Sequence, residues 1–221
     1  KVWSALPKAF EQDSSDAEKI QSSLDLLKDV KGSDCILVDS SKNSYPYLAE
    51  LIKNHDLKVI FLCRDIRSWS YSRTLSSSKP LLYYIFRWYA ENLKLISRIR
   101  KMGIELIPVG YEELALFPEY TFNSLCKDLQ LDYDPAMLKP GNTKSHIISG
   151  NVARVDKEKR SAWFYDSRWM TSSRISLYGP LTMFLSKFNN RWVYSRIKTG
   201  DIRKFHLFGT DKKEVLGKRF N

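Results

Sequence analysis

The clearest pattern of apolar and polar positions lies between residues 35 and 73. The runs CILVD (35–39) and KVIFLC (58–63) are rich in large aliphatic side chains and end abruptly in polar residues. Such runs are typical of strands buried on both faces of a parallel sheet. Between them, SYPYLAELIKN (44–54) carries apolar residues at helical spacing and suits a crossover helix. The pattern predicts strand, helix, strand and the start of a second helix.

The flanking sequence predicts further elements of the same kind. Apolar residues at helical spacing indicate helices before and after this unit, and a third strand follows the longest of them. The predicted segments are a helix over 14–32 with Ser14 or Ser15 as N-cap, a long helix over 81–103, a strand and turn over 104–114, and helices over 117–131 and 176–188. Together they predict a three-layer α/β domain, with a parallel sheet flanked by helices.

Length and charge refine this picture. The chain has 221 residues, which suits one domain over 1–221, with the sheet and its helices in 34–165 and a basic, aromatic C-terminal extension in 166–221. The net charge is +11, and much of the excess lies after Lys139. Such a charge raises the local concentration of anions. It is compatible with nucleic acid, anionic lipid or a phosphorylated nucleotide, and equally with a solvated, lysine-rich surface.

Several classes of protein are disfavoured by the sequence. No run approaches the ~18 apolar residues of a membrane span, and we expect no signal peptide. The three cysteines, Cys35, Cys63 and Cys126, form neither a disulfide framework nor a metal-binding spacing. We therefore expect a protein of a reducing compartment, cytoplasmic and without a metal.

Candidate chemistry lies at the carboxyl ends of the first two predicted strands. Asp39 and Lys42 follow the first strand, Arg64 follows the second, and Ser68 and Ser72 lie one and two turns further along the next helix. Open parallel sheets bind ligands outside these ends. An Arg fork matches phosphate or sulfate, and a helix N-terminus favours negative charge. The spacing predicts an anion site around Arg64.

A purely structural interpretation of the same residues is also open. In it, Arg64 forms an ion pair with Asp65 or Asp39, and the serine hydroxyls are only solvated. The spacing alone gives the two interpretations equal weight.

The segment VIFLCRDIRSWSYS (59–72) resembles the 3′-phosphate-binding segment of sulfotransferases that use 3′-phosphoadenosine-5′-phosphosulfate (PAPS). In that family a strand ends in Arg and a Ser follows eight residues later. Arg64 and Ser72 occupy those places, so the resemblance implies that both contact the 3′-phosphate. The upstream ILVDSSK (36–42) is similar to a segment of the bacterial and carbohydrate branches of the family.

Two later segments extend the resemblance to about residues 35–165. HIISGNVAR (146–154) is similar to the family's late basic segment, which implies that Arg154 also holds the 3′-phosphate. VGYEEL (109–114) resembles the family's strand that ends in Tyr-Glu-Asp-Leu, which implies that Tyr111 lies against the adenine. A tyrosine that merely covers the sheet edge is an equal alternative for Tyr111. The resemblance makes residues 34–165 a nucleotide-binding core.

Catalytic roles fall on Lys42 and Asp39. Sulfuryl transfer is an in-line displacement in which the protein positions the reactants and stabilises negative charge. Lys42 lies 22 residues before Arg64, near the place where cytosolic members of the family carry a catalytic His, and it could stabilise charge on the sulfonate. Asp39 could orient Lys42 or act as the base, and it could equally cap a loop.

One family feature is missing from these residues. Sulfotransferases bind the 5′-phosphosulfate with a Pro-Lys/Arg-Ser-Gly-Thr loop after their first strand, and no such segment occurs here. We therefore expect a P-loop-NTPase-like sulfotransferase fold that is N-terminally incomplete. A natural short relative that has lost sulfonation is the other possibility.

The expected function follows from this resemblance. It is transfer of a sulfuryl group from PAPS, leaving 3′-phosphoadenosine-5′-phosphate (PAP), to a hydroxyl or amine of a sugar, lipid or small molecule. The alternative is a non-catalytic nucleotide- or polyanion-binding protein of the same fold. A nucleotide kinase is a weaker hypothesis, because such an enzyme needs the same missing loop and an acidic Mg²⁺ ligand. We expect no specific nucleic-acid partner. The basic tail is compatible with binding to a membrane surface.

Overall fold

The computed structural model describes residues 15–32, 36, 38, 39, 48–53, 55–139, 165–178, 181, 182 and 185–196. The chain divides into two compact units. One comprises Lys1–Leu57 with Met102–Ile104, and the other comprises Lys58–Lys101 with Glu105–Asn221. The second unit contains the sheet and the Arg64 region.

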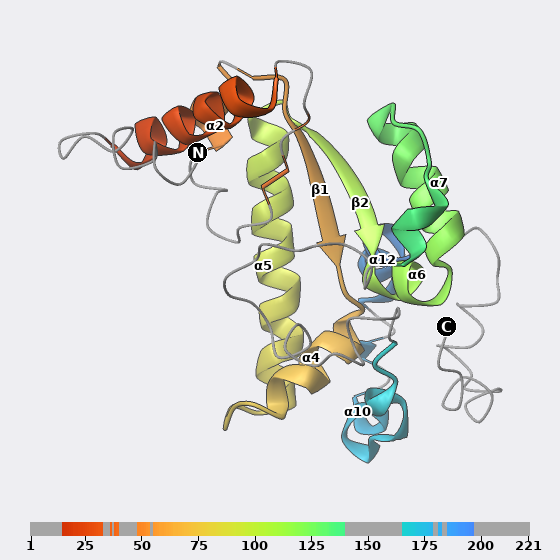
Figure 1. The fold of residues 1–221 in the computed structure, drawn as a ribbon. Helices are drawn as coiled ribbons and strands as arrows, with labels where there is room; N and C mark the ends of the chain where they lie inside the picture. The colour runs from red at the N-terminus through yellow and green to blue at the C-terminus, as the bar shows by residue number, and fades with distance from the viewer. Residues whose placement is uncertain are drawn as a thin grey trace. The chain divides into compact units, whose positions relative to one another are not determined.

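Two parallel strands form the sheet of the second unit. β1 (Lys58–Cys63) pairs with β2 (Glu105–Gly110), with Lys58 opposite Glu105 and Cys63 opposite Gly110 (Figure 1). Both strands were expected from their apolar runs. A small parallel sheet flanked by helices is thus confirmed, and the chain is a mixed α/β protein.

The connection between the strands is helical. α4 (Ile66–Thr74) follows β1, and α5 (Leu81–Lys101) leads to β2. α5 buries one stripe of side chains, including Ile85 and Trp88, and packs against α4 and β2. This stripe is what the helical spacing of apolar residues predicts. Among the described residues, no helix is long and apolar enough to cross a lipid bilayer.

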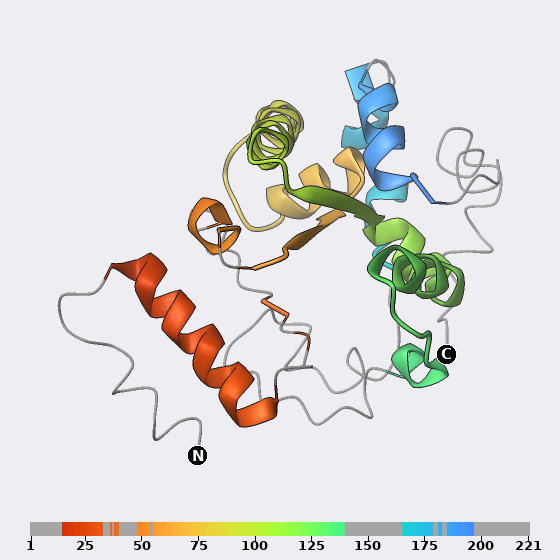
Figure 2. The ribbon, with the colours of Figure 1, turned by 90° about the horizontal axis from the view of Figure 1, so that it is seen from above.

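The C-terminal segment supplies part of the core. η4 (Arg168–Thr171), α10 (Ser173–Leu177) and α12 (Ser186–Val193) belong to the stretch that we expected to be an extension. The Phe61 ring meets the Trp192 ring edge to face, with centroids 6.0 Å apart. Figure 2 shows α5 and α12 on the same side of the two strands. On the other face of β1, Ile60 and Leu62 are exposed.

The packing of α12 on β2 depends on a glycine. A Cβ atom at Gly110, the last residue of β2, would collide with the backbone carbonyl oxygen of Val193. Only a residue without a side chain allows this approach of the α12 backbone. The contact fixes the end of α12 beside the carboxyl end of β2.

Two helices follow β2 directly. α6 (Tyr111–Leu116) leads into α7 (Pro118–Leu129), which has its proline in the first turn, where no helical N–H is lost. A 3₁₀ turn, η2 (Pro135–Leu138), comes next and packs against α7. The predicted helix over 117–131 is therefore present within a residue or two at each end.

The first unit contains α2 (Asp16–Lys31) and the short α3 (Leu48–Leu51). Ser15 is the N-cap of α2, one of the two predicted caps, and it forms a capping box with Glu18. The C-cap of α2 is Gly32, whose φ of 100° suits a glycine. The described helical turn of α3 is shorter than the crossover helix that we expected over 44–54.

The predicted strand over 35–39 is not found at its described residues. Ile36, Val38 and Asp39 have no strand structure, and Ile36 and Val38 are 66% and 80% exposed. An apolar run forms a strand only where a neighbouring strand supplies main-chain partners. The sheet of the described chain consists of β1 and β2, and no strand is assigned at Ile36, Val38 or Asp39.

Candidate functional site

Arg64 follows β1 at the carboxyl end of the sheet, where we expected an anion site. Its Nε donates a hydrogen bond to Ser68 Oγ at 2.7 Å, and its guanidinium carbon lies 4.8 Å from the centre of the Tyr111 ring. Trp88 Nε1 donates to the Arg64 backbone carbonyl at 2.9 Å. The side chain is 22% exposed. Arg64 is therefore held in place and still reaches solvent.

The acid that pairs with Arg64 is Asp166. An Arg64 Nη donates to its carboxylate at 2.9 Å, and Arg168 donates to both carboxylate oxygens at 2.8 and 2.9 Å. The backbone N–H of Asp166 donates to the Tyr111 hydroxyl at 3.2 Å. Burial alone would raise the pKa of Asp166, but the hydrogen bonds from Arg168 and Arg64 outweigh it and lower the pKa to about 2. Asp166 is an ionised carboxylate shared by two guanidiniums.

The structural alternative for Arg64 is correct about an ion pair but names the wrong partner. The sequence suggested Asp65 or Asp39 as its ion-pair partner, whereas the ion pair is with Asp166, 102 residues away. Asp65 instead pairs with Arg67 at 2.8 Å. Arg64 does lie in an ion pair, as that interpretation required, but it is also stacked and partly exposed as an anion-binding residue would be.

The start of α4 already carries a negative group. Asp65 is its N-cap, is fully buried, and accepts a hydrogen bond from the backbone N–H of Arg67 at 2.8 Å. We expected this helix N-terminus to help bind an external anion. The Asp65 carboxylate already accepts a hydrogen bond from one of its backbone N–H groups and places a negative charge there. The candidate site centres on the Arg64 guanidinium.

A second buried acid supports this turn. Glu112, in α6, accepts a hydrogen bond from the backbone N–H of Asp65 at 3.0 Å and is fully buried. Burial and the charge of Asp65 raise the pKa of Glu112 to about 8. The folded structure thus favours the protonated form of Glu112. The hydrogen bond from Asp65 ties the start of α6 to the start of α4.

Ser72 and Tyr111 were also expected at this site. Ser72 lies on α4 and is half-buried, but the hydroxyl that contacts Arg64 in the described structure is that of Ser68. Tyr111, expected against an adenine, packs its ring on Arg64. The structure therefore brings Arg64, Ser68 and Tyr111 together, and Ser72 lies one turn beyond Ser68.

The other predicted site residues are Lys42, Arg154 and Asp39. Lys42 and Arg154 lie outside the described residues. Asp39 is described, is exposed, and belongs to the first unit.

Sequence reasoning missed Asp166 and Arg168. They lie in the sequence YDSRW (165–169), which has no helical or strand period to suggest a site. A carboxylate two residues before an arginine is a weak local signal, and its contact with Arg64 depends entirely on the fold.

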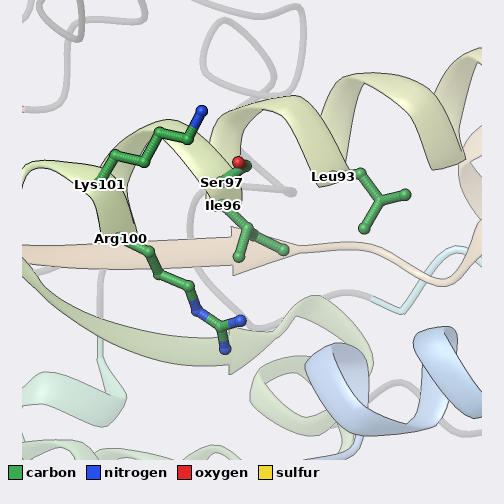
Figure 3. A pocket seen from close by; sticks show the side chains of 5 residues that line it. All are labelled: Leu93, Ile96, Ser97, Arg100 and Lys101. Atoms are coloured by element: carbon green, nitrogen blue, oxygen red, sulfur yellow. The ribbon is translucent and has the colours of Figure 1, made fainter.

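The structure also has a surface hollow away from this cluster. It has a volume of about 330 Å³ and is lined by one face of α5 (Figure 3), with Leu93, Ile96, Ser97, Arg100 and Lys101 around it. The Arg100 guanidinium also lies 5.1 Å from the centre of a Trp192 ring. None of the Arg64 cluster lines this hollow. In the part of the chain that is described, no group of His, Cys, Asp and Glu residues could hold a metal ion.

Comparisons with known proteins give no relatives for this chain. No protein-family model matches it, and neither a curated protein nor a solved structure matches it.

Proposed function

We propose that this chain is a PAPS-dependent sulfotransferase with a three-layer, P-loop-NTPase-like α/β fold. It transfers a sulfuryl group from PAPS to a hydroxyl or amine of a sugar, lipid or small molecule. The observation that carries the proposal is the guanidinium of Arg64, held at the carboxyl end of a parallel strand and partly exposed. This is the place in such sheets where ligands bind.

The surroundings of Arg64 fit a phosphate-binding role. The hydrogen bond to Ser68 and the stacking on Tyr111 fix the guanidinium plane, which reduces the entropy lost when an anion binds. A fixed Arg fork binds phosphate through two parallel hydrogen bonds. In the proposal this phosphate is the 3′-phosphate of PAPS, Ser72 provides a hydroxyl one turn beyond Ser68, and Tyr111 holds Arg64 in position.

The remaining roles rest on the resemblance in sequence. Arg154 is a further ligand of the 3′-phosphate, and Lys42 stabilises charge on the sulfonate. The acceptor oxygen or nitrogen forms a bond to sulfur, the bond from sulfur to the 5′-phosphate oxygen breaks, and PAP leaves with that electron pair. The acceptor proton passes to a base, for which Asp39 is the candidate.

The Arg64 site also suits a second function that needs fewer groups. A non-catalytic protein that binds a nucleotide or another polyanion would need only the Arg64 site and the charge of +11.

Calorimetric titration with PAP, beside 5′-AMP as control, tests the shared binding site. The proposal predicts clearly tighter binding of PAP, because only PAP carries the 3′-phosphate. Equal affinities would contradict it. Incubation with PAPS and a panel of hydroxyl and amine acceptors then separates the two functions, because only the enzyme releases PAP in an acceptor-dependent way.

A further inference from the structure

We propose that Asp166 is an internal anion that occupies the phosphate site of Arg64, and that a ligand phosphate displaces it and binds both Arg64 and Arg168. This inference rests on the proposed function, because it concerns the same site. It adds a second phosphate-binding guanidinium and a competitor built into the chain.

The geometry supports a shared anion position. One carboxylate oxygen of Asp166 accepts from Arg64 and from Arg168, each at 2.9 Å, and the other accepts from Arg168 at 2.8 Å. Two guanidiniums therefore already converge on one small anion. Carboxylate and phosphate oxygens match the Arg fork in the same bidentate way. A phosphate in place of the carboxylate would meet both guanidiniums.

The charges favour a dianion over Asp166. Two guanidiniums and one carboxylate leave the cluster with an excess positive charge. A phosphate monoester carries close to two negative charges at neutral pH and can neutralise both arginines, whereas a carboxylate or a sulfate ester carries one. Exchange of Asp166 for a phosphate is therefore electrostatically favourable, and exchange for a sulfate ester gains nothing in charge.

The exposure of the Arg168 side chain gives a ligand phosphate access to the position of the Asp166 carboxylate. The Arg168 side chain is 62% exposed, whereas the side chains of Arg64 and Asp166 are 22% and 10% exposed. An incoming anion can meet Arg168 in solvent first and then reach Arg64. Arg168 lies at the start of the single-turn η4, two residues from Asp166, so one short segment carries both the second guanidinium and the carboxylate.

The proposal fixes the sign of one substitution. If Asp166 competes with the ligand, Asp166→Asn removes the competing charge at nearly constant shape and raises the affinity for PAP. If Asp166 serves only to orient Arg64, the same substitution frees the guanidinium to move and lowers the affinity.

The experiment is calorimetric titration of PAP into the wild type, Asp166→Asn and a matched control, Asp128→Asn. Asp128 pairs with Arg196 and is absent from the Arg64 cluster, and its substitution changes the net charge equally. We expect Asp166→Asn to bind PAP about tenfold more tightly, the size of one charge-assisted hydrogen bond, and Asp128→Asn to match the wild type. Unchanged or weaker binding by Asp166→Asn would overturn the inference.

Two further measurements keep the test decisive. If Asp166→Asn does not fold, NMR of the wild type replaces the variant. We expect the carboxyl ¹³C resonance of Asp166 to shift on addition of PAP and to stay in place with 5′-AMP. No shift with PAP would overturn the inference. Failure of the proposed function looks different, because the wild type would then show no preference for PAP over 5′-AMP.

Discussion

The hydroxyl of Tyr194 donates a hydrogen bond to the carboxylate of Asp65 at 2.8 Å, across 129 residues of sequence. Asp65 is the N-cap of α4, the helix that follows β1, and Tyr194 comes directly after α12. Both side chains are buried. The bond therefore anchors the C-terminal segment to the turn that positions Arg64.

Tyr194→Phe should lower the free energy of unfolding by about 1.5–3 kcal/mol, the range for a hydrogen bond to a charged group. The ring remains in the variant, so the loss of stability is due to the missing hydroxyl. Urea unfolding measures this difference in the free energy of unfolding. Tyr89→Phe, on α5, is the control and should change stability by less than about 0.5 kcal/mol, because none of the described residues is hydrogen-bonded to its hydroxyl. Equal effects of the two substitutions would contradict the role of Tyr194.

The raised pKa of Glu112 predicts that the free energy of unfolding falls as the pH rises from about 4.5 to about 8. Its pKa is raised from 4.5 to about 8 in the folded protein, so the folded state binds this proton more tightly than the unfolded state. Its contribution is complete below about 4.5 and is lost as the pH rises towards about 8. Glu112→Gln cannot ionise and should flatten this decline in urea unfolding measured across the window. An identical decline in the variant would show that another group causes it.

Gly110→Ala should destabilise the second unit. Its Cβ atom would overlap the carbonyl of Val193, so the backbone of α12 or β2 must move. Overpacking of this kind costs about 1–3 kcal/mol in the free energy of unfolding. Gly103→Asn is the comparison, because Gly103 has open space around it and a φ of 71° that Asn tolerates. Gly110 should prove the more sensitive position in thermal unfolding, and the reverse order would refute the close approach.

Arg196 should be a stabilising residue of the C-terminal segment. Its guanidinium donates to the Pro108 carbonyl and to Ser124 Oγ and pairs with Asp128, and its side chain is only 6% exposed. Arg196→Ala should cost about 1.5–3 kcal/mol of stability, as for other hydrogen bonds from a charged group. The control, Arg191→Ala, removes an exposed arginine that lies over Trp192 and should cost less than about 1 kcal/mol. Similar losses in chemical denaturation would argue against this anchor.

The parts of the fold that local patterns determine could be predicted. β1 was expected at its observed bounds, because an apolar run that ends abruptly in Arg64 is a strong strand signal. The long α5 and the capped α2 follow from helical spacing and from Ser15. The run over 35–39 is rich in aliphatic residues like β1, yet its described residues are not a strand. Pairing with a neighbour decides this, and the run itself does not encode that neighbour.

The candidate site was only partly predictable for the same reason. Arg64 stands out because it ends a strand, and Ser68 because it lies one turn further along a helix. The Asp166 pair joins residues 102 apart in sequence, so no local spacing reveals it. Asp65 looked like a partner for Arg64, but as an N-cap its carboxylate turns back to the main chain and side chain of Arg67.

The affinity of Arg64→Ala for PAP tests the central claim most directly. The substitution removes the guanidinium while the backbone carbonyl that accepts from Trp88 remains. Arg73→Ala is the matched control, because Arg73 is exposed and lies over Trp69. We predict that calorimetry finds PAP binding weakened by about 1.5–3 kcal/mol in Arg64→Ala and unchanged in Arg73→Ala, with both variants folded. Equal affinity for PAP in Arg64→Ala and the wild type would contradict a phosphate site at Arg64.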